Sequence, residues 1–570
     1  MAASWMPISH LEILLAFACF LFLGHTFLRN KNTKKKEAFV AVNWPLLGML
    51  PYLLLNISRF HDWTTDILRR SVGCTFVFHG PWFSAMEMVC TCDPSNVRHI
   101  MCTNSSNYPK GPEFARIFEV LGDGIFNADA DMWILQRKMG HSVISGSNFR
   151  RLVAKSGHEK VDKGLLPLLH HMLRAGQAFD LQDVFQRFTF DATCILVFGT
   201  DPASLSSTFP TVPFSKAMDD AMEALLLRHI VPESWWMLMS WLNIGHEKKL
   251  AEAKKTIDCF IHQQISKTRD ELSKRKSETM TEEEEEAEDH VDMSSGGILA
   301  SYISSSACSS EDTTGITKSD KFLRDSAVNF MLAGRDTTSS ALTWFFWLIS
   351  NNPRVEMKIL EELKRVKSTK HAQPKVLHDD GGGGEAEQIP CVFDAEELSG
   401  LVYLHAALCD SLRLFPPVPF EHKGVVQQEV LPTGEMVRPN TKVLISLFSM
   451  GRMESIWGED CLDFKPERWI SERGRLKFQP SYKFMAFNAG PRICLGREVA
   501  FTQMKLVVAA VLYNFQVEVV AGHPVEPKNS IILHTKSGFM VRVRRRKLSS
   551  CFLLRSSSEE SALSTGVTPP

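Results

Sequence analysis

Two long apolar stretches and several short ones organise the hydrophobic pattern of this chain. Residues 11–28 are almost wholly apolar, and at about 1.5 Å per residue they can just cross a hydrocarbon core of about 30 Å as a helix. Residues 328–350 are apolar nearly all round, which is typical of a helix buried in a core. Strand-like runs lie at 75–80, 441–447 and 538–544. Since long helical patterns dominate the rest, the pattern predicts a mainly α fold with a smaller β part.

Basic residues follow the first apolar run instead of preceding it. Arg29, Lys31 and Lys34–Lys36 come directly after residue 28. A cleaved signal peptide carries its basic residues before the apolar run, so this order favours an uncleaved anchor with the rest of the chain in the cytosol. We therefore expect a membrane anchor with a basic flank at residues 1–36 and a Pro- and Gly-punctuated hinge at 37–51.

The remainder, residues 52–547, is long enough for one large domain or two ordinary ones. Three polar segments look unsuited to a packed core: an acidic insertion at 282–289, a Gly-rich insertion at 371–390 and a Ser-rich tail at 548–570. We expect the insertions to be mobile and the tail to be disordered.

Charge and cysteine content narrow the class of protein. The net charge is -1, from 64 basic and 65 acidic residues, so nothing indicates binding to nucleic acid. The 13 cysteines are scattered and odd in number, which favours a reducing compartment over a disulfide framework.

One cysteine stands in an unusual loop. In "FNAGPRICLG" (487–496), Phe487, Gly490, Arg492, Cys494 and Gly496 form the pattern F-x-x-G-x-R-x-C-x-G. With this composition, those five positions coincide by chance in roughly one in 10⁴ chains of this length. No second cysteine or histidine stands at a spacing that would complete a zinc site.

A haem iron held by one thiolate fits this loop. Such a ligand donates electron density to the iron and favours cleavage of a bound O–O bond, while small neighbours let backbone N–H groups approach the sulfur. Arg492 is then expected to face a haem propionate. The alternative, a buried structural cysteine, leaves both glycines and the arginine unexplained.

Polar residues interrupt the second apolar stretch at its middle. Gly334, Asp336 and Thr337 lie there, and buried polar groups are costly unless they are paired. The Thr337 hydroxyl can bond back to the carbonyl of Ala333, bending the helix and opening a notch that could seat O₂ and a water. The alternative is a threonine tolerated on a helix surface.

Four motifs together resemble the cytochrome P-450 family of haem-thiolate monooxygenases: "WILQR" (133–137), "AGRDTT" (333–338), "FKPERW" (464–469) and "FNAGPRICLG". The likeness runs from the anchor to about residue 547. It implies the mainly α fold of that family, with a long central helix over haem b and the thiolate loop beneath it.

The resemblance also implies a role for individual residues. The iron ligand is Cys494, in a haem-binding loop with Phe487, Gly490 and Gly496; the proton-delivery pair is Asp336 and Thr337; the propionate contacts are Trp133, Arg137 and Arg492; and the structural triad behind the haem is Asp410, Arg413 and Arg468. The family's Glu-x-x-Arg is here Asp410-Ser-Leu-Arg413, one methylene short. We therefore expect this chain to hold its haem less firmly than its relatives, and Asp410→Glu to strengthen it.

Residues 188–205, 449–474 and 498–505 carry a narrower resemblance, to the plant hydroxylases that act at the end of fatty acids and, among them, the midchain alkane hydroxylases of cuticular wax. This implies a long-chain aliphatic substrate, an alkane or a fatty acid. By analogy, residues 122–133, 416–423 and 533–539 line the pocket.

The reaction implied inserts one atom of O₂ into a C–H bond with two electrons from NADPH. No dinucleotide fingerprint occurs in the chain, so a separate NADPH-cytochrome P-450 reductase is expected, with cytochrome b5 as a second candidate donor. The chain could offer an acidic partner a docking surface of basic residues, namely Arg137, Lys138, Lys483 and Arg497. The alternative is that these residues form only a solvated basic face. The implied location is the endoplasmic reticulum membrane.

Two other functions stay open at this point. One is a haem isomerase or dehydratase that rearranges lipid peroxides without a reductase, although such relatives tend to lose the acid and threonine that this chain keeps. The other is a non-catalytic membrane protein that binds haem or acts as a scaffold, which Asp410 and the insertions alone support.

Overall fold

The chain folds around one long helix, α15 (Asp320–Ser350), in the computed structural model. The structure describes residues 43–279, 296–304, 319–370 and 390–546, leaving out positions 45, 83 and 85. The expected anchor, the acidic insertion, the tail and all of the Gly-rich insertion but residue 390 lie outside the described residues. No helix in the described part of the chain is both long enough and apolar enough to cross a bilayer.

Helix α15 begins eight residues before the apolar stretch that predicts it. Its start is set by Ser319, whose hydroxyl accepts a hydrogen bond of 3.2 Å from the Phe322 N–H and so satisfies one free donor of the first turn. Along its length it packs against α9 (Leu181–Phe198). At Gly334 the two helices approach so closely that an added Cβ would lie 2.6 Å from Thr193 Oγ1. The glycine therefore permits this packing.

The other helices surround α15 in two groups that bury most of the core. One group comprises α8 (Leu166–Ala175), α16 (Pro353–Lys370), α17 (Ala395–Ser399), α18 (Val402–Leu414) and α21 (Arg497–Asn514). The other comprises α5 (Gly111–Ile117), α6 (Ala130–Ile144), α7 (Ser147–Lys160), α10 (Pro213–Ile230), α11 (Glu233–Leu242), α12 (Gly245–Thr279) and α13 (Gly297–Ser304). Short helices α2 (Leu50–Leu55), α3 (Phe60–Arg70), α4 (Pro94–Arg98), α19 (Leu447–Met450) and α20 (Glu454–Trp457) complete the set named here.

The β part is small and lies at the edges of the helical body. A four-stranded sheet has the order β1 (Thr75–His79), β2 (Glu87–Thr91), β7 (Lys442–Ser446), β4 (Phe420–Gly424), and only the β2–β7 pair is parallel. A second sheet pairs β3 (Phe179–Asp180), β9 (Met540–Arg545) and β8 (Phe515–Val519), and a third pairs β5 (Glu429–Val430) with β6 (Met436–Val437). The strands predicted at 75–80, 441–447 and 538–544 are confirmed as β1, β7 and β9.

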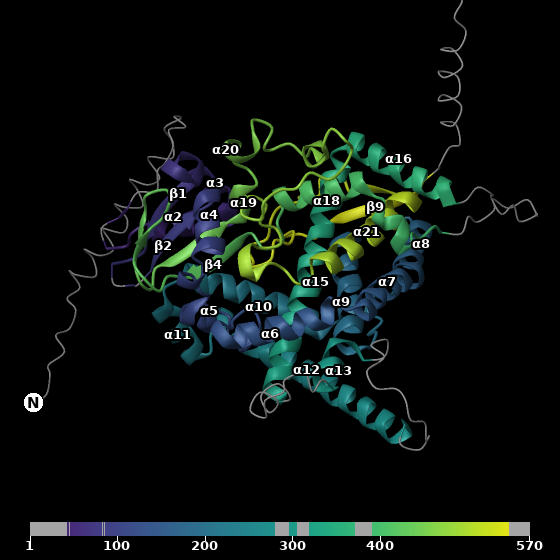
Figure 1. The fold of residues 1–570 in the computed structure, drawn as a ribbon, viewed down its shortest axis with the longest axis horizontal. Coiled ribbons are helices and arrows are strands. Elements are labelled where there is room, and N and C mark those ends of the chain that lie inside the picture. Colours follow the sequence, from purple (N-terminus) through teal and green to yellow (C-terminus); the bar gives the residue numbers. More distant parts are fainter. Residues whose placement is uncertain are drawn as a thin grey trace, which may run out of the picture.

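Figure 1 shows the first sheet with α2, α3 and α4 on one side of the molecule and α16, α18 and α21 on the other, with α15 between them. The described part of the expected hinge is held against the sheet region. Trp44 and Gly48 exchange two backbone hydrogen bonds of 2.9 Å, and the Met49 N–H donates to His79 O at 2.7 Å. This stretch is therefore a docked turn that leads into α2.

Candidate active site

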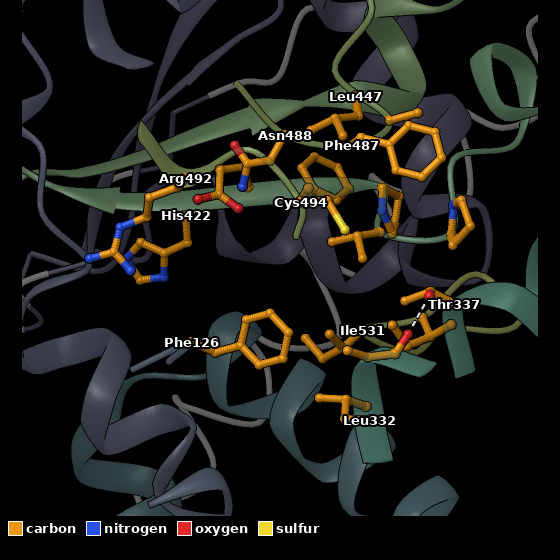
Figure 2. Close-up of a pocket in the computed structure, with 18 of the residues that line it drawn as sticks. Phe126, Leu332, Thr337, His422, Leu447, Phe487, Asn488, Arg492, Cys494 and Ile531 are labelled. Carbon is orange, nitrogen blue, oxygen red and sulfur yellow. Dashed lines mark hydrogen bonds between the residues drawn. The ribbon is translucent and has the colours of Figure 1, made fainter. Parts of the chain in front are cut away.

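A cavity of about 430 Å³ lies between the Cys494 loop and the middle of α15. Its walls are mostly apolar, and Figure 2 shows Phe126, Leu332 and Ile531 across the gap from Cys494. Further lining residues come from the N-terminal elements and extend the apolar wall: Leu53, Trp63, Phe76, Phe78 and Met88. The cavity thus connects the loop to the sheet with a continuous apolar surface.

Cys494 presents its sulfur to this cavity. Its backbone N–H donates a 2.8 Å hydrogen bond to Phe487 O, which closes the loop, and its Sγ points into the gap above Thr337 and Leu332 (Figure 2). Burial raises the pKa of the Cys494 thiol, whereas the Gly496 N–H and the charges of Arg137 and Arg497 act in the opposite direction. The surroundings therefore hold donors and cations ready for a thiolate.

The two glycines of the loop, Gly490 and Gly496, are needed for different structural reasons. Gly490 has φ +61°, and a Cβ there would lie 1.8 Å from Met101 O, so no other residue fits without moving that backbone. Gly496 lies beside the sulfur, since a Cβ there would be 3.9 Å from Cys494 Sγ. Phe487 fixes the other end of the loop by packing on Phe501, with ring centroids 5.1 Å apart.

Three expected cofactor contacts meet at one side of the loop. The Arg492 guanidinium lies 4.9 Å from the centre of the Trp133 ring and donates to Asp129 Oδ1 at 2.5 Å. Arg137 donates through Nη1 to Ile493 O, next to Cys494. Trp133, Arg137 and Arg492 all line the cavity, so the structure brings together residues that are far apart in sequence.

Lys110 and Glu421 form a buried pair in the same wall, and no pattern in the sequence signalled it. Lys110 Nζ donates to Glu421 Oε1 at 2.8 Å, and Lys423 Nζ lies 3.4 Å from the same oxygen. Burial by itself raises the pKa of Glu421, but the charges of Lys110 and Lys423 outweigh it and lower the value to about 2. With Arg492 nearby, this side of the cavity is cationic, and it suits an anionic edge of a ligand.

Thr337 faces the cavity and Asp336 does not. The Thr337 hydroxyl donates to Ala333 O at 2.6 Å, as the sequence predicts, and Thr337 lines the cavity (Figure 2). The Asp336 carboxylate instead accepts from Arg335 Nη1, and its Oδ2 has no hydrogen-bond partner among the described residues. Burial raises the pKa of Asp336 to about 7, against the lowering effect of Arg335. This carboxyl group can therefore gain and lose a proton near neutral pH.

In the Asp410 cluster the shorter acid still pairs directly with both arginines, and the expected weakening of haem retention stays a prediction. Asp410 is fully buried and directly reaches both arginines, with Arg413 Nε at 2.7 Å and Arg468 Nε at 3.1 Å. The Trp469 indole N–H and the Lys465 backbone N–H donate to it at 2.9 and 2.6 Å. Both carboxylate oxygens of Asp410 thus accept hydrogen bonds from helix α18 and from residues 465–469, whereas Arg468 Nε approaches Asp410 Oδ1 as an ion pair without a hydrogen bond.

The expectation that residues 533–539 line the substrate pocket is wrong. Residues 122–133 and 416–423 contribute to the cavity, but none of residues 533–539 does, and Ser530, Ile531 and Ile532 take that place. Of the four basic residues considered for docking, Lys138 and Arg497 are exposed, whereas Arg137 lines the cavity.

The cavity fits a haem group. Its apolar walls suit a flat porphyrin ring, the cationic side suits two propionates, and a single accessible sulfur suits one axial bond to iron. Among the described residues, no group of three or more histidine, cysteine or carboxylate side chains could hold a metal ion. The sulfur of Cys494 points into this cavity (Figure 2).

Comparison with known proteins gives a consistent result. The family model "Cytochrome P450" matches residues 44–543. Noroxomaritidine synthase from Narcissus aff. pseudonarcissus MK-2014 is 42% identical over 96% of this chain and 99% of its own length. Alkane hydroxylase MAH1 of Arabidopsis thaliana is 43% identical over 88% of this chain and 93% of its own, and cytochrome P450 86B1 of the same plant is 41% identical over 95% and 90%.

Proposed function

Because the chain belongs to the cytochrome P450 family, we propose that it is a monooxygenase of long-chain aliphatic substrates, either alkanes within the chain or fatty acids at or near the chain end. The family is one of haem b enzymes that receive electrons from a separate reductase. In the net reaction, one atom of O₂ enters a C–H bond, and the other leaves as water with two electrons and two protons.

Haem, when bound, supplies the redox chemistry of this reaction and the site at which O₂ is reduced. In our proposal Cys494 would bind the iron through its sulfur, beside the backbone N–H of Gly496. Arg137, Arg492 and Trp133 would contact the propionates, and Phe487 and Gly490 shape the loop that would hold the group.

Asp336 and Thr337 are proposed to supply protons to the cavity. The observation behind this role is the position of the Thr337 hydroxyl on the cavity wall, one residue from a carboxyl group whose pKa lies near 7. A group with that pKa can donate and recover a proton at the pH of the cytosol.

The aliphatic substrate rests on the shape and chemistry of the cavity. The lining between Cys494 and the N-terminal elements is mostly apolar and includes Phe126, Leu226 and Phe78. A chain of methylene groups gains roughly 0.8 kcal/mol for each CH₂ that it buries there. The relatives carry different names, synthase and alkane hydroxylase, at nearly equal identity. Sequence identity therefore does not choose between their substrates, and the proposal of an aliphatic substrate depends on the apolar lining of the cavity.

We also propose attachment to the endoplasmic reticulum membrane. Residues 11–28 supply the apolar run, and helix α11 offers a second contact. Trp235 and Trp241 on α11 are 60% and 80% exposed, and exposed tryptophans are typical of a membrane–water boundary.

Reconstitution tests the substrate class. The full chain, with NADPH and a cytochrome P450 reductase, is incubated with alkanes and fatty acids of graded length, and mass spectrometry locates the new hydroxyl group. Leu332→Phe narrows the cavity on the side opposite Cys494 (Figure 2), so it should lower turnover several-fold while the ferrous carbonyl spectrum stays intact. If no aliphatic compound shifts the Soret band on binding or gives a product, the proposed substrate class is wrong even though the family is not.

A further inference from the structure

A second cavity, of about 120 Å³, borders the first one at Ser530. It is formed by α9, α10 and the loop before β9, and its lining is mainly polar: Gln182, Gln186, Asp219, Met222, Lys528, Ser530, His534, Thr535, Lys536 and Gly538. Ser530 lines both cavities. The segment expected at the substrate pocket, residues 533–539, therefore contributes to a separate polar cavity.

Two side chains beside this cavity are buried with unpaired polar atoms. His534 Nδ1 and Asp336 Oδ2 have no hydrogen-bond partner in the part of the chain that the structure describes, and the two side chains are only 8% and 1% exposed. Their other atoms approach each other, with His534 Nε2 at 3.9 Å from Asp336 Oδ1. Such groups are costly to bury unless water pairs with them. A polar cavity needs only about 10–15 Å³ to hold one water molecule, so this one has ample room.

We propose that this cavity holds water and that His534 relays protons from it to Asp336, which supplies Thr337 and the active site. The proposal rests on the roles proposed above for Asp336 and Thr337. It adds a route by which protons reach Asp336 from the surface, and it names His534 as the residue on which this route depends.

A water molecule in the cavity gives a proton to one ring nitrogen of His534 and takes one back from bulk solvent, while the other ring nitrogen releases its own proton toward Asp336. The ring is then the opposite tautomer, and it returns to its first form by rotation or by a second exchange with water before the next transfer. The Asp336 carboxylate takes up that proton and supplies it by way of water to the Thr337 hydroxyl on the cavity wall, which releases its own proton into the active-site cavity. Two such transfers match the two electrons that each turnover consumes.

The charges around the pair favour neutral relay groups. Burial lowers the pKa of His534 to about 4, although the negative charge of Asp219 opposes that shift, and Arg335 and Lys528 add to it. The ring is therefore neutral at pH 7, as exchange between its two nitrogens requires. Arg335 Nη1 contacts both Asp336 and Asp219, the latter at 3.0 Å, and Lys528 is paired with Glu223 at 2.5 Å. Asp183 also acts on Arg335.

Asp219 connects the route to solvent. Its side chain is 34% exposed, lines the second cavity and accepts a hydrogen bond from Arg335. It is thus the one lining group of this cavity, among those described here, that both reaches bulk water and contacts the Arg335–Asp336 pair. A proton entering there needs no opening of the apolar substrate cavity.

The first test compares His534→Gln with His523→Gln in the full-length holoenzyme. Glutamine keeps polarity and approximate volume but cannot exchange protons between two ring nitrogens. We expect His534→Gln to lower product formed per NADPH by about tenfold, below the roughly 10²-fold effect of losing a proton donor because water replaces part of the route. Peroxide should rise in proportion, and the solvent deuterium isotope effect should increase. His523 is not itself a lining residue and contacts the cavity wall only through its 3.0 Å hydrogen bond to Gly538 O, which a glutamine can also make, so its variant should match the wild type.

Thr337→Ala distinguishes failure of the His534 relay from failure of the role proposed for Thr337. If Thr337→Ala diverts NADPH into peroxide and His534→Gln does not, the relay is wrong and the role of Thr337 stands. If neither variant does so, the proton pathway proposed for α15 fails as a whole, and the relay fails with it.

A second measurement needs no turnover. Below pH 7 the protonated Asp336 carboxyl should give an infrared C=O band in the ferric holoenzyme, identified by its loss in Asp336→Asn. The frequency of that band depends on the hydrogen bonds of the carboxyl group. His534→Gln should shift it and His523→Gln should not. A band unmoved by His534→Gln would show that the two groups are not linked and would overturn the proposal.

Discussion

Arg413 and Asp410 face each other three residues apart on helix α18, with Arg413 Nε donating to Asp410 Oδ1 at 2.7 Å and Nη2 donating to Oδ2 at 3.2 Å. The guanidinium also donates to the carbonyls of Gly451 and Cys461, each at 2.5 Å. This one arginine therefore joins the helix to the loop that follows α19 and α20. Its carboxylate partner stands where the motif expected from sequence has a glutamate.

Replacement of Asp410 tests how that cluster holds the fold around the haem. Asp410→Ala leaves two buried arginines without their shared partner and should cost about 3 to 5 kcal/mol. Asp410→Glu forces an extra methylene into a filled site and should cost about 1 to 3 kcal/mol. The measurement is the fraction of intact haem-thiolate spectrum that remains during heating or in mild urea. If Asp410→Glu keeps a larger fraction of intact haem-thiolate spectrum than the wild type, the result supports the expectation made from sequence, that the shorter acid weakens haem retention.

Cys494→Ser should abolish the strongly red-shifted Soret band of the ferrous carbonyl complex, because a serine hydroxyl does not replace the thiolate. Cys259→Ser is the matched control, since Cys259 is exposed on α12. Circular dichroism of both variants checks that the fold persists. Survival of the band in Cys494→Ser would contradict the assignment of the iron ligand.

The raised pKa of Asp336 predicts a pH-dependent stability. The folded protein binds this proton more tightly than the unfolded chain, so ionising Asp336 lowers stability as the pH rises from about 4 toward the folded pKa of about 7. The asparagine introduced by Asp336→Asn cannot ionise. The free energy of unfolding of this variant minus that of the wild type should therefore increase over this range, by at most about 4 kcal/mol. Urea titrations of the haem-loaded proteins at several pH values measure it, and parallel pH curves would contradict it.

Membrane attachment should depend mainly on residues 1–36. A chain that lacks them should be released from microsomes by carbonate far more completely than the full chain, because the apolar run is gone. Trp241→Ser in the shortened chain should release still more. Phe478→Ser is the control, since Phe478 is 85% exposed in the loop after η8 (Pro466–Trp469). Equal retention of the shortened and full chains would refute the anchor.

The sequence by itself determined the buried helix, the three strands and the thiolate loop, because each depends on a local pattern. Apolar residues all round predict burial of α15, and Thr337 bonds to Ala333 within a single turn of that helix. Gly490 and Cys494 belong to one short loop, so the spacing of the two residues in the sequence is enough to predict the loop and its exposed sulfur.

Only the tertiary structure decided which distant groups meet. Lys110 and Glu421 form their buried pair across 311 positions of sequence, and no local pattern encodes such a contact. Asp410 could be judged short only against a family motif, whereas the nitrogen atoms that surround it come from α18 and from residues 465–469 packed against it. His534 lies in the segment expected to face the substrate, yet long-range packing turned it toward Asp336, since the path of a loop is set by the surfaces on which it packs.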